Sequence, residues 1–155
     1  MLYVEAPSTF TRDMPGKLFS GGGITGCANW QKPFYRSLDR RFRSGVFFNP
    51  RRAHYKYTPE DAHQQIAWEF EYMRLADAIS FWFSPETLCP IALFELGKWI
   101  VSTKPVFVGV HPDYRRGLDV HEQCELQRPE IKIATSLEEL ANQVANWLHA
   151  VPTKA

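Results

Sequence analysis

The sequence has few cysteines, and they form neither a metal-binding motif nor a disulfide framework. Three cysteines occur in 155 residues, at Cys27, Cys89 and Cys124, with no Cys-x-x-Cys pair among them. An odd number of scattered cysteines is typical of a protein kept in a reducing compartment. We therefore expect a cytoplasmic protein that folds without a disulfide, a metal ion or another cofactor.

A charge excess and a long apolar run are also missing. Eighteen Lys and Arg residues against 17 Asp and Glu residues leave a formal net charge of +1, so no general field attracts nucleic acid or an anionic membrane. No apolar stretch approaches the roughly 20 residues that cross a bilayer. Residues 1–8 lack the basic start and apolar run of a signal peptide. The expected partners are small molecules, with no nucleic acid polymer and no membrane.

The chain is rich in the residues that build one compact core. Hydrophobic residues make up 45% of it and aromatic residues 14%. A domain of this length buries about two-thirds of the surface of its extended chain, which is enough for a self-sufficient core. We expect a single domain over residues 1–155, with its core over about 17–150 and an N-terminal extension over 1–16.

Strand-like and helix-like segments alternate along the chain. The expected strands cover residues 17–21, 46–49, 77–83, 105–110 and 131–133. The expected helices cover residues 25–39, 59–76, 91–102 and 136–150. Right-handed crossovers between parallel strands place helices on both faces of the sheet. The pattern predicts an α/β, flavodoxin-like (Rossmann-like) three-layer sandwich with a five-stranded parallel sheet.

The loops that follow the expected strands contain the residues suited to ligand binding, since ligands of such sheets bind beyond the carboxyl ends of the strands. Three consecutive glycines after the first strand let backbone approach a ligand closely, although they match neither a dinucleotide nor a triphosphate motif. Asn49, Arg51 and Arg52 follow the second strand, and Arg115 and Arg116 follow the fourth. These arginines either hold a phosphate or are solvated surface charges.

Two carboxylates stand out. Glu95 lies in the apolar helix expected after Pro90, where it either pairs with Lys98 on an exposed face or faces a polar cleft. Asp77 opens the central strand, where it either caps the helix-to-strand turn or contacts a ligand. In the helix before Asp77, Ile66 and Phe70 are expected in the buried stripe.

Four motifs together resemble the nucleoside 2-deoxyribosyltransferase-like family. They are Leu18–Trp30 with its glycine run, Phe48–Arg52, Ala76-Asp77 followed by Phe81–Phe83, and Glu86–Gly97 with its Glu-Leu-Gly. The resemblance extends from about Leu18 to about Leu140. Members often have an aspartate where this chain has Cys89 and Pro90, and often a tyrosine where it has Leu18 or Phe19.

The resemblance implies a reaction and roles for particular residues. The reaction is cleavage of the N-glycosidic bond of 2′-deoxynucleosides, with transfer of the deoxyribosyl group to an acceptor base. Glu95 matches the nucleophile that forms a glycosyl-Glu intermediate, and Asp77 matches a carboxylate that binds or protonates the base. Gly21, Gly22 and Gly23 match the loop that contacts sugar and base.

Other functions fit the same residues. One is a 2′-deoxynucleoside 5′-monophosphate N-hydrolase, favoured if the arginines hold a phosphate. Another is a nucleotide-binding sensor without turnover, because fold does not determine function. An FMN-binding flavodoxin is a third, but the chain has no hydroxyl-rich phosphate loop after its first expected strand.

The resemblance also implies a homo-oligomer, a dimer or larger. Aromatic residues of the helices expected over 25–39 and 59–76 offer more apolar surface than one face of the sheet can cover, so some are expected to be exposed or buried between subunits. These residues are Trp30, Phe34, Trp68, Phe70 and Tyr72. The helix over 59–76 or the one from Pro90 to Ser102 is expected at the contact.

Overall fold

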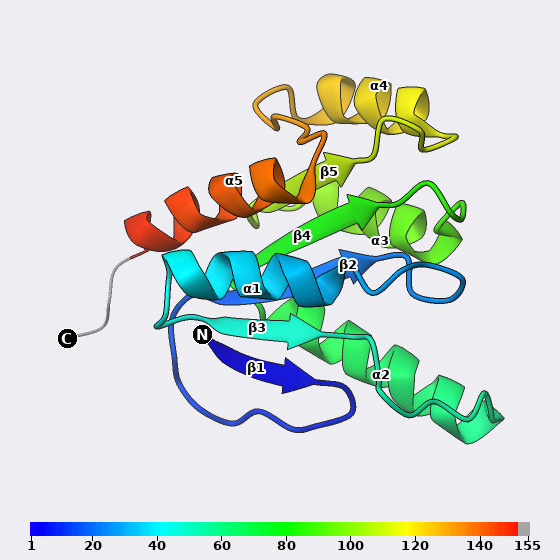
Figure 1. Ribbon diagram of the computed structural model, residues 1–155, viewed down its shortest axis with the longest axis vertical. Helices are drawn as coiled ribbons and strands as arrows, with labels where there is room; N and C mark the ends of the chain where they lie inside the picture. The colour runs from blue at the N-terminus through cyan, green and yellow to red at the C-terminus, as the bar shows by residue number, and fades with distance from the viewer. Residues whose placement is uncertain (152–155) are drawn as a thin grey trace.

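The computed structural model of the protein describes residues 1–151, which form five strands and five helices (Figure 1). The strands are β1 (Leu2–Glu5), β2 (Lys17–Gly22), β3 (Val46–Asn49), β4 (Ala78–Phe83) and β5 (Val106–Val110). The helices are α1 (Gln31–Arg41), α2 (Pro59–Leu75), α3 (Pro90–Ile100), α4 (Gly117–Gln127) and α5 (Leu137–Ala150). None of these helices is both long and apolar enough to cross a membrane.

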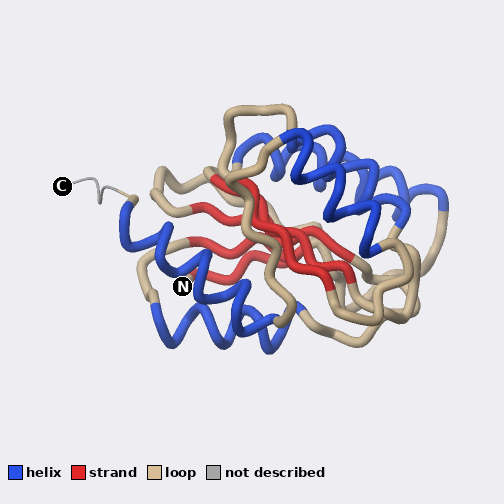
Figure 2. The backbone as a smooth tube through the Cα atoms, turned by 90° about the horizontal axis from the view of Figure 1, so that it is seen from above, coloured by secondary structure: helices blue, strands red, loops and turns tan. Residues whose placement is uncertain are grey.

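All five strands are parallel and lie in the order β1-β3-β2-β4-β5. Helices α1 and α5 cover one face of the sheet, and α2, α3 and α4 cover the other (Figure 2). This arrangement confirms the predicted α/β, flavodoxin-like sandwich with a five-stranded parallel sheet. The carboxyl ends of the strands meet at one edge, on the right in Figure 1.

Strand β4 lies at the centre of the core, and all six of its residues are buried. Ile79, Phe81 and Phe83 pack on the side of α2 and α3, whereas Ala78 and Trp82 pack on the side of α1 and α5. A nearly continuous apolar run is the expected sequence of a strand that is covered on both faces. The strand expected over 77–83 is therefore correct to within one residue.

Two predictions are wrong: a fifth strand over 131–133, and residues 1–16 as an extension outside the core. Residues 2–5 form β1, which pairs with β3 in the register Val4↔Phe48, so they belong to the sheet. Residues 131–133 form no strand, and that edge of the sheet has a single bridge between Gly109 and Ala134. The Ile131 amide instead donates to the Arg128 carbonyl at 2.9 Å, a local turn that prevents pairing with β5.

Two helices differ from their expected positions. α1 begins at Gln31 rather than near residue 25, because the preceding segment turns at Gly26, whose φ is +74°. α4, over Gly117–Gln127, was not expected, since its sequence has little amphipathic pattern. Thr58 and Ser136 cap the starts of α2 and α5, close to where helices were expected: Thr58 Oγ1 accepts from the Asp61 amide and Ser136 Oγ from the Glu139 amide.

Helix α2 has a different buried face from the expected one. Trp68, Tyr72 and Met73 are buried, whereas Ile66 and Phe70 are 66% and 53% exposed. Trp68 Nε1 and Tyr72 Oη both donate to the Ser8 carbonyl, at 2.9 and 3.1 Å. The segment between β1 and β2 therefore covers the aromatic residues that were expected in part at a subunit contact.

Asp77 lies at the amino edge of the sheet, opposite the edge where ligands bind. Its amide donates to the Lys17 carbonyl at 2.7 Å, and its Oδ2 accepts from the Lys17 amide at 2.9 Å. Lys17 Nζ is 3.1 Å from the same oxygen. A residue that begins a parallel strand is at the amino edge, so the interpretation of Asp77 as a residue that contacts the base is wrong, and its capping role is the one that fits.

Replacing Asp77 with Ala is expected to lower the free energy of unfolding by about 1–2 kcal/mol, because the Lys17 amide loses its acceptor and the Lys17 ammonium keeps only the Met14 carbonyl. Urea unfolding at pH 7 measures this change. Catalytic activity per folded molecule should equal that of the wild type. A stable Asp77→Ala protein without activity would contradict this assignment.

Candidate active site

A cavity of about 830 Å³ opens at the carboxyl edge of the sheet. Its walls come from the ends of β1, β2 and β3, the loops that follow β2, β3 and β4, the middle of α2 and the first two turns of α3. The predicted site residues among its lining are Gly21, Gly22, Gly23, Asn49, Arg51, Arg52 and Glu95. Asp77 is not among them. The volume lies within the range of small-molecule sites.

The backbone of the glycine loop requires glycine at two positions. Gly22 has a φ of +148°, and a Cβ there would lie 2.4 Å from the Trp82 carbonyl oxygen. A Cβ on Gly23 would lie 2.4 Å from the sulfur of Cys27 and 2.8 Å from that of Cys89. A side chain at position 22 would force the loop away from β4, and one at position 23 would displace the two thiols.

Asn49 and Arg51 hold two loops together beneath the cavity. Asn49 is buried, with Oδ1 accepting from the Arg51 amide at 3.1 Å and Nδ2 donating to Tyr3 Oη at 2.6 Å. Arg51 Nε donates to Gln31 Oε1 at 2.8 Å, and its Nη2 donates to the carbonyl of Ala28 at 3.0 Å. Burial lowers the pKa of Arg51 from its ordinary value. These contacts give both residues a role in shaping the site.

Arg52 is less fully paired. Its Nη2 lies 3.6 Å from Asp61 Oδ1, and its guanidinium carbon lies 5.5 Å from the centre of the Tyr55 ring. Its Nε is buried and has no hydrogen-bond partner within residues 1–151. A buried donor without a partner costs free energy unless a ligand supplies an acceptor. Arg52 is therefore the better placed of the two arginines to bind a ligand oxygen.

Glu95 faces the cavity from the second turn of α3 and is largely buried. Burial, together with the nearby Glu69 carboxylate, raises its pKa to about 8, and Lys98 opposes this shift. Lys98 Nζ lies 4.5 Å from the centre of the Phe70 ring, on the outer side of the helix. Of the two alternatives for Glu95, the polar cleft is therefore the one that the structure supports.

Glu69 is a site residue that the sequence reasoning missed. It lines the cavity from α2, where its Oε1 accepts from Gln65 Nε2 at 2.9 Å, and burial raises its pKa. Gln65 and Glu69 are four residues apart and share a helix face. This polar pair, on the same side of the helix as the buried Trp68, was the signal in the sequence that could have pointed to Glu69. The expectation that Ile66 and Phe70 form the buried face placed Gln65 and Glu69 on the wrong side.

Thiols and hydroxyls form the wall beside the start of α3. Ser84 Oγ donates to Cys27 Sγ at 3.2 Å, and Thr87 Oγ1 lies 3.4 Å from Cys27 Sγ and 3.3 Å from Cys89 Sγ. Cys89 is the N-cap of α3 and has a φ of +48°. This left-handed residue lets the chain turn sharply from β4 into the helix that carries Glu95.

The fold and this cavity define an α/β protein whose candidate site, at the carboxyl edge of the sheet, is lined by carboxyl groups of the protein itself. Residues 16–114 match the family model described as nucleoside 2-deoxyribosyltransferase like. The match covers more than half of the chain, so the protein belongs to this family. The resemblance inferred from the motifs is confirmed.

A crystal structure of a conserved protein from Enterococcus faecalis V583 is similar in fold, with a TM-score of 0.62 and 13% sequence identity. The similarity covers 85% of this chain and 98% of the other. At this identity it shows a shared fold only. No curated protein sequence matches the chain.

The raised pKa of Glu95 predicts a stability that falls with increasing pH. Below pH 4.5, its ordinary pKa, the carboxyl group is protonated in both the folded and the unfolded state. As the pH rises toward about 8, the unfolded chain releases this proton while the folded protein keeps it, so the free energy of unfolding falls. The other charged or titratable side chains that line the same cavity are Glu5, Cys27, Arg51, Arg52, Tyr55, Tyr57, Glu69 and Cys89.

Replacing Glu95 with Gln should remove much of this dependence, because the amide does not titrate. We expect the variant to exceed the wild type in unfolding free energy by about 3 kcal/mol at pH 8, and to differ little at pH 4.5. Urea unfolding across this pH range measures the difference. Glu122→Gln, on the exposed surface of α4, is the control and should leave the wild-type profile unchanged.

Proposed function

We propose that the protein cleaves the N-glycosidic bond of 2′-deoxynucleosides and transfers the deoxyribosyl group to an acceptor base. The observation that carries the proposal is Glu95, a largely buried carboxyl group facing a cavity large enough for a nucleoside. Membership of the nucleoside 2-deoxyribosyltransferase-like family supports a reaction of this class. The chemistry needs no redox step and no cofactor.

The proposed reaction has two halves that share one intermediate. In the first, a carboxylate oxygen of Glu95 bonds to C1′ of the sugar while the C1′–N bond breaks. The bonding electron pair leaves with the base, which takes up a proton. In the second, a nitrogen of the acceptor base bonds to C1′ and releases its N–H proton while the ester bond breaks, which restores the Glu95 carboxylate and balances the proton taken up in the first half. Two displacements at one carbon give net retention of configuration.

The other cavity residues support binding in this proposal. The backbone of Gly21, Gly22 and Gly23 lets the sugar approach Glu95 without a side chain in between. Asn49 and Arg51 keep the two loops in place through their mutual contacts. A 2-deoxy sugar lacks the electron-withdrawing hydroxyl next to C1′, so its oxocarbenium-like transition state forms more easily.

A second candidate function is the hydrolysis of 2′-deoxynucleoside 5′-monophosphates. The observation that favours it is Arg52, whose Nε is buried without a partner within residues 1–151. A phosphate oxygen is a strong acceptor for a guanidinium N–H. Water in place of the acceptor base would complete the same two displacements.

Glu95→Gln is expected to reduce base release by several orders of magnitude, because the amide cannot form the ester. The assay incubates wild type and variant with 2′-deoxynucleosides and their 5′-monophosphates, with and without free acceptor bases. Chromatography separates and quantifies the released base and the new nucleoside. Glu122→Gln should behave as the wild type.

Each result of this assay has a distinct meaning. New nucleoside formation supports transfer, and base release from monophosphates without transfer supports the second candidate. Binding of nucleotides without turnover would identify the sensor that the sequence also allowed. Activity of Glu95→Gln within threefold of the wild type would exclude Glu95 as the nucleophile.

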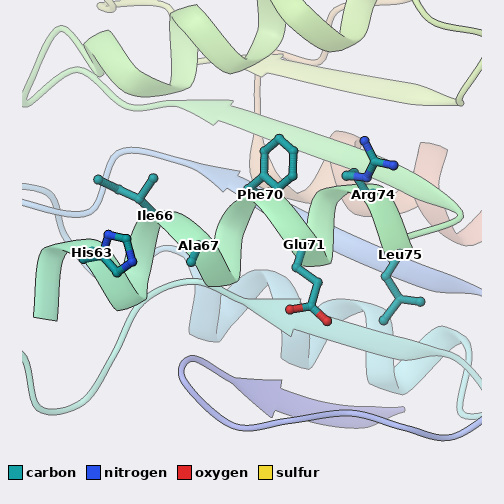
Figure 3. Close-up of a pocket in the computed structure, with 7 residues that line it drawn as sticks. All are labelled: His63, Ile66, Ala67, Phe70, Glu71, Arg74 and Leu75. Carbon is teal, nitrogen blue, oxygen red and sulfur yellow. The ribbon is translucent and has the colours of Figure 1, made fainter. Parts of the chain in front are cut away.

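A homo-oligomer is part of the proposal, with α2 and α3 at the contact. The outer α2–α3 surface, formed by Ile66, Phe70, Ile91 and Phe94, has four large apolar side chains, each more than half exposed. A groove of about 800 Å³ runs along α2 beside them, and Figure 3 shows Phe70 with Glu71 and other lining side chains on that helix. Ile91 also lines the cavity, so the surface borders the mouth of the site.

A second copy of the chain is the occupant that this surface fits best. Glu71 and Arg74 both line the α2 groove. In a two-fold arrangement, each charge can face the opposite charge on the partner while the apolar side chains meet between them. A contact of this kind would also cover the mouth of the cavity and limit the access of water.

Phe94→Glu is expected to dissociate the oligomer, because two carboxylates would be buried at the contact. Size exclusion with light scattering at micromolar concentration should give at least twice 17.9 kDa for the wild type and 17.9 kDa for the variant. Leu126→Glu, on the exposed face of α4, is the control and should leave the mass unchanged. A wild-type mass of 17.9 kDa would contradict the proposal.

The cytoplasm stays the expected location. Cys27, Cys89 and Cys124 are all free thiols. Unpaired, partly or fully buried thiols fit a reducing compartment.

A further inference from the structure

Two thiols lie close together in the wall of the cavity, where the loop after β2 meets the start of α3. Cys27 comes from the loop and Cys89 from the N-cap position of the helix, and both line the cavity. A Cβ added at Gly23 would lie 2.4 Å from Cys27 Sγ and 2.8 Å from Cys89 Sγ. The two sulfurs therefore border the same small space and cannot be further apart than the sum of these distances, about 5.2 Å.

Only weakly bonded groups surround this pair of sulfurs. Thr87 Oγ1 lies 3.4 Å from Cys27 Sγ and 3.3 Å from Cys89 Sγ. Ser84 Oγ donates to Cys27 Sγ at 3.2 Å. Sulfur is a weak hydrogen-bond partner, so little is lost when these contacts change. Gly23 has no side chain to keep the sulfurs apart. Rotation of the two side chains and a shift of the loop would bring them together.

The two thiols differ in how an oxidant can reach them. Cys27 is partly exposed and opens on the cavity, whereas Cys89 is 4% exposed. Arg51 lies beside Cys27, with its Nη2 donating to the Cys27 carbonyl at 3.2 Å. An accessible thiol next to a guanidinium is the kind that oxidants attack first. Burial raises the pKa of Cys89, so this residue is suited to react second.

The third cysteine has none of these features. Cys124 is 1% exposed, packs in the core under α4, and does not line the cavity. Burial raises its pKa to about 11. The cysteines thus divide into a pair at the site and a single thiol in the core. In a reducing compartment a disulfide is usually transient and belongs to catalysis or redox sensing, which fits a pair at a site.

We propose that Cys27 and Cys89 are a redox modification site, at which a hydroperoxide converts the two thiols into a disulfide that inactivates the protein. With hydrogen peroxide, the Cys27 sulfur bonds to one oxygen as the O–O bond breaks, which gives a sulfenic acid and one water. The Cys89 sulfur then bonds to the Cys27 sulfur as the S–O bond breaks, and a second water leaves. The thiols lose two electrons and two protons, which the peroxide takes up. A dithiol reductant reverses the change.

The expected inactivation follows from what the loop after β2 contacts. Arg51 Nη2 donates to the carbonyls of Cys27 and Ala28, and so joins this loop to the loop after β3. A bond to Cys89 would draw Cys27 toward α3 and disturb these contacts. Glu95 follows Cys89 by less than two turns of the helix. The change therefore takes place beside the carboxyl group that the proposed function uses.

The first measurement is the mass of the chain after treatment of the reduced protein with hydrogen peroxide. We expect the loss of two hydrogen atoms, a peptide cross-link between Cys27 and Cys89, and the starting mass again after dithiothreitol. Cys27→Ser should form no cross-link. Cys89→Ser should stop at the sulfenic acid, so that dimedone labels Cys27. Cys124→Ala is the matched control and should form the same cross-link as the wild type.

The second measurement is base release from 2′-deoxynucleosides before and after peroxide. We expect the wild type and Cys124→Ala to lose activity about tenfold or more, because small displacements at a reacting centre have large effects on rate. Dithiothreitol should restore the activity. Cys27→Ser should keep its own untreated activity within twofold after the same treatment.

The outcomes separate this inference from the proposed function. A cross-link between two chains, or sulfinic acid at Cys27 without the bond to Cys89, overturns the modification site. A Cys27–Cys89 disulfide that leaves activity unchanged overturns its inactivating role. A wild type that releases no base overturns the proposed function alone, since the mass of the chain still decides whether the disulfide forms. Binding of 2′-deoxynucleoside 5′-monophosphates, before and after peroxide, then replaces activity as the measure of inactivation.

Discussion

Burial of β4 on both faces is the constraint on which the rest of the structure depends. A strand with six buried residues requires a helical layer on each side. Because the strands are parallel, each connection leaves the sheet at its carboxyl edge and brings the chain back to the amino edge. The loops after β2, β3 and β4 consequently meet at the carboxyl edge. A cavity forms there because these loops diverge around the sheet rather than continuing it.

The cavity owes its shape to contacts between segments that are distant in the chain. Arg51 from the loop after β3 donates to carbonyls of the loop after β2, and Trp30 Nε1 donates to the Gly23 carbonyl at 2.8 Å. Glycine at 22 and 23 lets the second of these loops lie against β4. Arg51 and Glu69, two of the charged residues that line the cavity, are held by hydrogen bonds within the protein, as a preorganised site requires.

Several elements were predictable because their signals are local. The cap residues Thr58 and Ser136 bond to amides three residues on, and the apolar run of β4 reflects burial on both faces. The strand predictions were wrong where the conformation of a short segment depends on a partner that is distant in the chain. Residues 2–5 become a strand because β3 offers them an edge, whereas residues 131–133 have strand-forming residues but make a local turn.

The sequence by itself determined the fold class, the family and the presence of an acidic residue in an apolar helix, since periodicity, glycine runs and motif order are properties of neighbouring residues. Only the tertiary structure decided which charged groups share a cavity. It separated Asp77 from the site, because a residue that begins a strand lies at the opposite edge, and it brought in Glu69 from another helix. Packing between α2 and α3 places Glu69 beside Glu95, and no local pattern in the chain encodes the distance between them.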